Sequence, residues 1–165
     1  MDMLRGTQIA LIAAVCLWGL LSAFGNLLDW SGTLGAVTAV AAMSTWDGGG
    51  ADWRAIGSPV LITTAALAIV AFKLLSALLC GLGAARMVRE RGAPVETFAA
   101  AEATALSGCG IAMLGLFLGW IVLGEQWFEL WRSPELGAAG DAAFRYGGFI
   151  GVIALFVAIR DQRPA

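Results

Sequence analysis

Histidine is missing altogether from this chain of 165 residues, and charged residues make up only 13% of it. Ordinary soluble domains carry about 25% charged residues, because polar groups must cover much of their surface. Here hydrophobic residues make up 59% of the sequence, and the mean hydropathy is +0.82. This composition excludes an ordinary soluble domain and indicates an integral membrane protein.

The absence of histidine also removes several kinds of site. A histidine-ligated haem or chlorophyll, a zinc site that includes histidine, and Ser-His-Asp or Cys-His catalysis are all excluded within this chain. Cys16, Cys80 and Cys109 lie in apolar stretches without CxxC spacing, so we expect them to pack as small apolar residues. The net charge of −2 gives no indication of nucleic-acid binding. We therefore expect no metal, no cofactor and no nucleic-acid partner.

Four stretches are apolar and long enough to cross a hydrocarbon core about 30 Å thick, which takes roughly 20 helical residues. They are residues 6–28, 59–85, 98–123 and 142–159. The first is too long for the apolar region of a signal peptide, so we expect it to be retained. The sequence predicts an all-α fold in which residues 1–165 form one domain, a four-helix transmembrane bundle.

The segment between the first two spans, residues 29–58, is long for a connection within a bundle. Leu34, Val37 and Ala41 recur in it at helical spacing. This pattern predicts a short interfacial helix that lies on the membrane surface in the first outer loop. The glycine run 48–50 is expected to break that helix.

Positive charge differs between the two sides of the predicted bundle. One side carries Arg5, Arg86, Arg89, Arg91, Arg160 and Arg163, and the other side carries Arg54, Arg132 and Arg145. Cytoplasmic segments of membrane proteins carry the excess of Lys and Arg. We therefore expect a multi-pass membrane protein with both termini in the cytoplasm.

Three charged residues fall inside the predicted spans: Lys73, Glu102 and Arg145. A charge in hydrocarbon is costly, so it usually has a partner or faces a water-filled cavity. Lys73 and Glu102 could form a structural pair, although helix rise places Glu102 roughly 10 Å nearer the cytoplasm. Alternatively, Lys73 lies on a proton, ion or quinone path, or meets another subunit. Arg145 is expected to be held by a carboxylate or by carbonyl groups.

Acidic residues and tryptophans gather in the two outer loops. The candidates there for contacts with a protein partner or with lipid are Asp29, Trp53, Arg54, Glu125, Trp127, Glu129 and Trp131. Indoles favour the membrane interface because the ring is apolar and its N–H can still donate a hydrogen bond. The alternative is that the charged members form a salt-bridge network that ties the loops to the bundle.

Several of these stretches resemble a bacterial family of predicted small integral membrane proteins of unknown function. They are residues 24–30 (FGNLLDW), 53–59 (WRAIGSP), 124–131 (GEQWFELW) and 143–145 (AFR). The resemblance covers essentially the whole chain and implies four spans with a long first outer loop. It implies no activity, cofactor or catalytic residue. The family tends to carry an acid in the middle of the second span, where this chain has Lys73.

Together these features favour a non-enzymatic accessory or structural subunit of a larger bacterial inner-membrane complex, whether respiratory, photosynthetic or for transport. The expected partners are membrane lipids and other membrane protein subunits. Glycine pairs at 115/119 and 147/151 have the spacing of close helix packing. One alternative is the small membrane subunit of a solute transporter. Another is an enzyme handling lipid or quinone, with Glu102, Glu125 or Glu129 as its acid or base.

Overall fold

The computed structural model describes residues 2–159, and within that range the chain is helical with no strand. The helices are α1 (Asp2–Leu28), α2 (Trp30–Ala41), η1 (Gly49–Ala51), α3 (Pro59–Arg89), α4 (Val95–Leu116), η2 (Phe117–Trp127), η3 (Leu130–Arg132) and α5 (Gly137–Val157). η1 and η3 are single 3₁₀ turns, and η2 continues α4 as a π-helix. In the described part, four helices are long and apolar enough to cross a membrane. The predicted four-helix transmembrane fold is confirmed.

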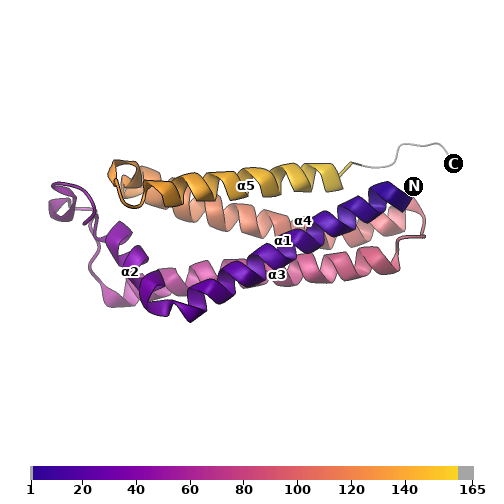
Figure 1. Ribbon diagram of the computed structural model, residues 1–165, viewed down its shortest axis with the longest axis horizontal. Helices are drawn as coiled ribbons and strands as arrows, with labels where there is room; N and C mark the ends of the chain where they lie inside the picture. Colours follow the sequence, from indigo (N-terminus) through magenta and orange to yellow (C-terminus); the bar gives the residue numbers. More distant parts are fainter. Residues whose placement is uncertain (1, 160–165) are drawn as a thin grey trace.

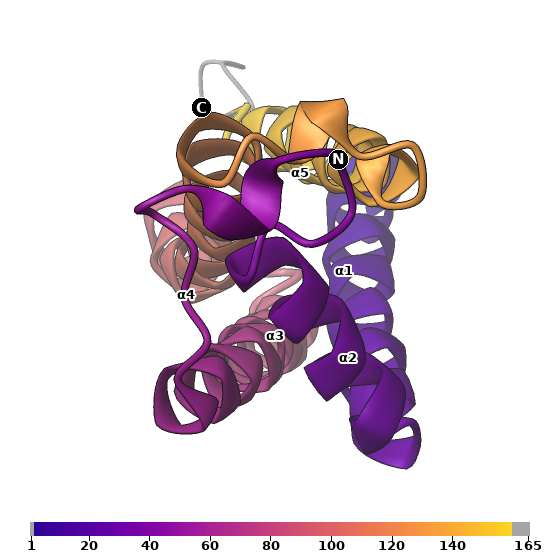
Figure 2. The same ribbon diagram turned by 90° about the vertical axis from the view of Figure 1, so that its left-hand side faces the viewer.

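The four long helices run roughly along one axis (Figure 1). α3 packs extensively against both α1 and α4, and α4 also packs against α5. One end of the bundle, here named the turn end, holds the start of α1, the 90–94 turn and the end of α5. The opposite end is covered by residues 42–58 and 128–136, here named the cap. Figure 2, which faces the cap, shows its two segments lying across that end of the helices.

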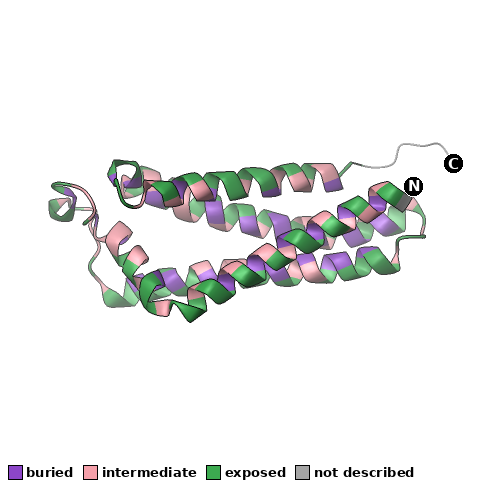
Figure 3. Ribbon diagram, viewed as in Figure 1, coloured by how far each residue is buried: buried purple, intermediate pink, exposed green. Residues whose placement is uncertain are grey.

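Small residues let α3 and α4 approach closely. A Cβ atom added to Gly83 would lie 2.5 Å from the backbone nitrogen of Ala105, and one added to Gly108 would lie 2.7 Å from that of Cys80. Real side chains never come so close, so glycine is required at both positions. Figure 3 shows exposed residues along the outward faces of the long helices. Many of these exposed residues are large and apolar, as expected for a surface that a membrane surrounds.

The first long connection contains the helix predicted there, α2. Asp29 is its N-cap, because one carboxylate oxygen accepts a 2.9 Å hydrogen bond from the Gly32 nitrogen. α2 packs against α3 and α1. Beyond it, Gly48 adopts a positive φ of 83°, a conformation that favours glycine, within the run expected to break the helix.

The third span changes its helical form near the cap, which nothing in the sequence pattern predicted. From Phe117 to Trp127 the helix is a π-helix, and the Phe128 nitrogen donates to the Leu123 carbonyl, five residues back. π-helical segments are rare, usually a single turn, and frequent at functional sites. η2 leads directly into the cap, so the change alters which side chains reach it.

Candidate functional site

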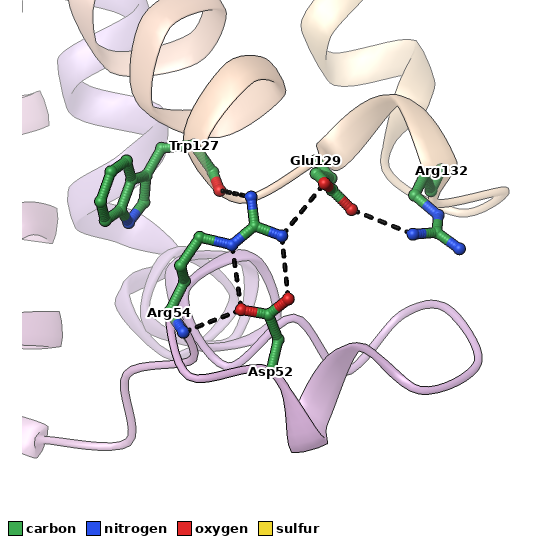
Figure 4. Close-up of polar contacts among 5 residues, drawn as sticks. All are labelled: Asp52, Arg54, Trp127, Glu129 and Arg132. Carbon is green, nitrogen blue, oxygen red and sulfur yellow. Dashed lines mark hydrogen bonds and ion pairs between the residues drawn. The ribbon is translucent and has the colours of Figure 1, made fainter.

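Arg54 joins the two segments of the cap (Figure 4). Its Nε and one terminal nitrogen donate to the two carboxylate oxygens of Asp52, both at 2.9 Å. The same terminal nitrogen lies 3.0 Å from a carboxylate oxygen of Glu129, and the other donates to the Trp127 carbonyl at 3.0 Å. The Arg54 side chain is only 18% exposed. A planar guanidinium supplies this many directed donors at once, which a lysine could not.

Glu129 lies where η2 gives way to η3, and its backbone has a positive φ of 53°. Few residues other than glycine adopt this conformation, which costs free energy and persists where the surroundings enforce it. It aims one carboxylate oxygen at Arg54, while the other accepts a 3.0 Å hydrogen bond from Arg132. The Arg132 guanidinium in turn lies 3.8 Å from the centre of the Trp46 ring. One continuous charged network therefore spans both cap segments.

The network changes the acidity of its carboxyl groups. Hydrogen bonds from Arg54 lower the pKa of Asp52 to about 2. Hydrogen bonds from Arg132 and Arg54 lower the pKa of Glu129, and both acids raise the pKa of Arg54. Each group is thus favoured in its charged form.

These shifts predict a loss of stability in acid. The pKa values of Asp and Glu in an unfolded chain are about 3.9 and 4.3. Because their folded-state pKa values are depressed, the network stabilises the fold above about pH 4 and stops doing so as the pH falls towards 2. Melting followed by tryptophan fluorescence from pH 6 to pH 2 should show this decline in the native protein and a flatter profile in Arg54→Gln. Parallel profiles would contradict the role of the network, and Arg89→Gln, at an exposed arginine of the turn end, is the control.

Three tryptophans stand exposed in or directly beside the cap, and we name them the aromatic surface. Trp53 is 81% exposed, Trp131 66% and Trp127 44%. Trp53 and Trp127 contact each other edge to face, with ring centroids 5.7 Å apart. Trp53 directly precedes Arg54, and the carbonyl of Trp127 accepts from that arginine. The network therefore fixes the backbone that presents the aromatic surface.

The other outer candidates lie apart from this network. Asp29 caps α2, and Glu125 places its carboxylate against Gly140 in the first turns of α5. Arg145 differs from the expectation that a carboxylate or carbonyl would hold it: it is exposed and has no such partner among the described residues. It lies on the outward face of α5, where its long side chain can reach towards the interface. Arg160 and Arg163 lie outside the described residues.

Within the spans, Lys73 has a different partner from the one considered first. Its Nζ donates a 2.7 Å hydrogen bond to Oδ1 of Asn26 on α1. Glu102 is buried on α4, thirteen residues before Gly115, which packs beside Phe72. That spacing puts Glu102 about 20 Å from the level of Lys73 along the helix axis. Lys73 thus pairs with Asn26 of α1 rather than with Glu102.

Two polar residues near the start of α1 were not singled out from the sequence. Arg5 donates to the carbonyls of Arg91 and Ala93, at 2.6 and 2.8 Å, and lies 4.5 Å from the centre of the Phe98 ring. Gln8 donates to the carbonyl of Val157 at 3.0 Å. The available signal was their i, i+3 spacing, which puts both on one helix face at the edge of an apolar run.

The fold and these charged ends define an integral membrane protein with several spans. The chain belongs to the family described as predicted small integral membrane protein (DUF2165), whose model matches residues 4–160. No curated protein and no solved structure matches it. The family carries no known function, so the function rests on the geometry above.

Proposed function

We propose that this protein is a non-enzymatic accessory subunit of a larger membrane complex and that it binds a partner subunit through the aromatic surface. The observation that supports this is that one partly buried arginine, Arg54, binds Asp52 and the Trp127 carbonyl and so fixes the backbone at Trp53 and Trp127. Residues that contribute most to protein–protein binding are enriched in Trp, Tyr and Arg. A surface already held in place loses little conformational entropy on binding.

The charged network favours a protein partner over simple anchoring of the tryptophans in lipid. A tryptophan that only anchors a helix at the membrane interface needs no ion pairs to hold its backbone. Here Arg54 contacts the Trp127 carbonyl and the Glu129 carboxylate, which lie far from it in sequence, while Asp52 holds its guanidinium locally. We therefore infer a partner that is itself membrane-bound, with an apolar surface level with the cap.

The proposal also states which end of the bundle faces the cytoplasm and in which membrane the protein lies. Arg5, Arg86, Arg89 and Arg91 lie at the turn end, whereas Arg54 and Arg132 lie in the cap. By the excess of positive charge, the turn end faces the cytoplasm and the cap faces outward across a bacterial inner membrane. A membrane-impermeant thiol reagent added to intact cells should label a cysteine placed at Trp53 and not one placed at Arg89.

Site-specific photocrosslinking in the native membrane tests the proposed docking surface. A benzoylphenylalanine at position 53 or 131 should give one defined crosslinked protein band, identified by mass spectrometry. The same probe at Phe149, a 71% exposed residue on the outward face of α5, is the matched control and should give mainly lipid adducts. The same partner should co-purify in mild detergent with the native chain.

Co-purification of the partner should require an intact cap and not merely the presence of the protein in the membrane. Arg54→Gln should weaken co-purification without removing the protein from the membrane. A monodisperse protein with no stoichiometric partner, or crosslinks to lipid alone at positions 53 and 131, would contradict the proposal.

A further inference from the structure

A cavity of about 500 Å³ lies on the cap side of the bundle, between α1, α2, α3 and the α4–η2 helix. Its walls are almost entirely apolar and include the aromatic rings of Trp18, Phe72, Trp120 and Phe128. Small side chains leave this space, among them Ala65, Ala68 and Gly119. Its size falls within the range of about 300–1,000 Å³ typical of ligand pockets.

A few polar side chains line the cavity, and they form one connected group. Lys73 Nζ donates to Asn26 Oδ1, and Asn26 Nδ2 donates to the hydroxyl of Thr33 at 3.1 Å. The Thr33 hydroxyl in turn donates to the backbone carbonyl of Asn26 at 3.0 Å. This arrangement fixes the Asn26 amide with its oxygen towards the lysine. All three residues line the cavity.

The ammonium group of Lys73 is left with donors to spare. An ammonium group has three N–H donors. Among the described residues, the side-chain oxygen of Asn26 is the acceptor that Lys73 Nζ contacts, and no carboxylate lies within ion-pair distance of it. Lys73 is the fifteenth of the 31 residues of α3, close to the middle of that span. A charge at this depth is stabilised by an opposite charge. An apolar cavity that ends at an unmatched cation suits a ligand with an apolar body and one anionic end.

We propose that this cavity binds a single-chain acidic amphiphile of the fatty-acid class, with its carboxylate paired to Lys73 and its alkyl chain along the apolar walls. A carboxylate is the smallest anionic group that a lipid carries. A phospholipid would have to bring a whole headgroup about 20 Å below the start of α3 to reach Lys73. The cavity shares Trp127 with the aromatic surface, but neither Trp53 nor Trp131 lines it, so the two proposals are tested at different residues.

The cavity also has an entrance that suits such a ligand. Leu61, Ala65 and Ala68 of α3 and Leu118 of η2 line it while remaining exposed. The side between α3 and η2 is therefore open towards the surroundings of the bundle, which in a membrane are lipid. A fatty acid can enter from the bilayer without crossing the cap.

Quenching of tryptophan fluorescence by dibromostearate tests the site, because Trp18, Trp120 and Trp127 line the cavity. The full-length protein is placed in phosphatidylcholine vesicles and titrated with the brominated acid. We expect a saturable component that unbrominated stearate reverses. The methyl ester of dibromostearate, which has no charge, should show only the non-saturable quenching of a lipid dissolved in the bilayer.

Two variants and their matched controls locate the site. Lys73→Met should weaken saturable binding about tenfold or more, and Lys73→Arg should retain most of it. Lys73→Met removes a charge from the middle of a span, so loss of folding is not its expected effect. Gly119→Leu should fill the cavity and abolish the component. Gly110→Leu adds the same side chain on the exposed side of α4, away from the cavity, and should leave binding unchanged.

Three results would overturn the proposal. The first is equal saturable quenching by the acid and its methyl ester, which would make Lys73 irrelevant to recognition. The second is saturable quenching by brominated phosphatidylglycerol alone, which would replace the fatty acid with a phospholipid. The third is unchanged affinity for dibromostearate in both Lys73→Met and Gly119→Leu. Loss of the partner crosslinks at position 53 would leave this test unaffected, so the two proposals fail separately.

Discussion

Gly83→Leu is expected to lower the stability of the bundle strongly. The new Cβ would lie within 2.6 Å of the backbone nitrogen and Cα of Ala105, and backbone atoms cannot move aside as a flexible side chain can. Overpacking of this kind costs about 3 kcal/mol. At about 2–4 °C per kcal/mol, the melting temperature should fall by roughly 10 °C.

Gly110→Leu is the matched control, because it shows the effect of the same substitution on stability where the new side chain meets no neighbour. Leucine has a higher helix propensity than glycine by almost 1 kcal/mol, so local preference alone would make both variants more stable. Nothing lies within 4 Å of a Cβ at Gly110, and that variant should be neutral or slightly stabilised. Thermal melts in one detergent by size-exclusion chromatography would compare the two. Equal shifts for Gly83→Leu and Gly110→Leu would show that α3 and α4 do not pack as closely as described.

Arg5→Met is expected to detach the turn end of α1. Arg5 is 4% exposed, and it supplies donors to the carbonyls of Arg91 and Ala93. Those carbonyls belong to the connection between α3 and α4 and would lose their charged donor. Hydrogen bonds to charged groups contribute about 1.5–3 kcal/mol, so a loss of about 3 kcal/mol is expected for the pair. The cation–π contact with Phe98 would be lost as well.

Hydrogen–deuterium exchange can localise the effect of Arg5→Met. Residues 90–94 should exchange faster in the variant, whereas the cap at the other end of the bundle should not change. Arg89→Met removes an exposed arginine from the same end and should alter neither region. Faster exchange throughout the bundle in both variants would contradict a local role for Arg5.

The spans were predictable from the sequence because each one depends on local composition. A run of about 20 apolar residues is helical in a membrane whatever surrounds it, since its backbone groups must pair within the segment. The four predicted stretches accordingly agree with the helices to within a few residues at most ends. α2 was predictable for a similar reason, from the spacing of Leu34, Val37 and Ala41 within 29–58.

The candidate site was predictable only in part. The concentration of tryptophan and acid in the outer loops identified the cap, but not which charges pair. Arg54 was one of several candidates, and its carbonyl partner Trp127 lies 73 residues away. Arg145 was expected to be held by a carboxylate or by carbonyl groups, yet it lies on the exposed face of α5. Depth follows from sequence position, whereas pairing follows from the rotation of each helix about its axis.

The sequence by itself determined that this protein is a four-span membrane protein with a charged, tryptophan-rich end, because hydropathy and helix rise act within one segment at a time. Only the tertiary structure decided which of the 22 glycines bring helices together, that Lys73 meets Asn26, and that a cavity lies beside them. These features depend on how side chains from separate helices fit against one another. That fit depends on the register of each helix and on its rotation about its axis, and neither can be read from the hydrophobic pattern of a single segment.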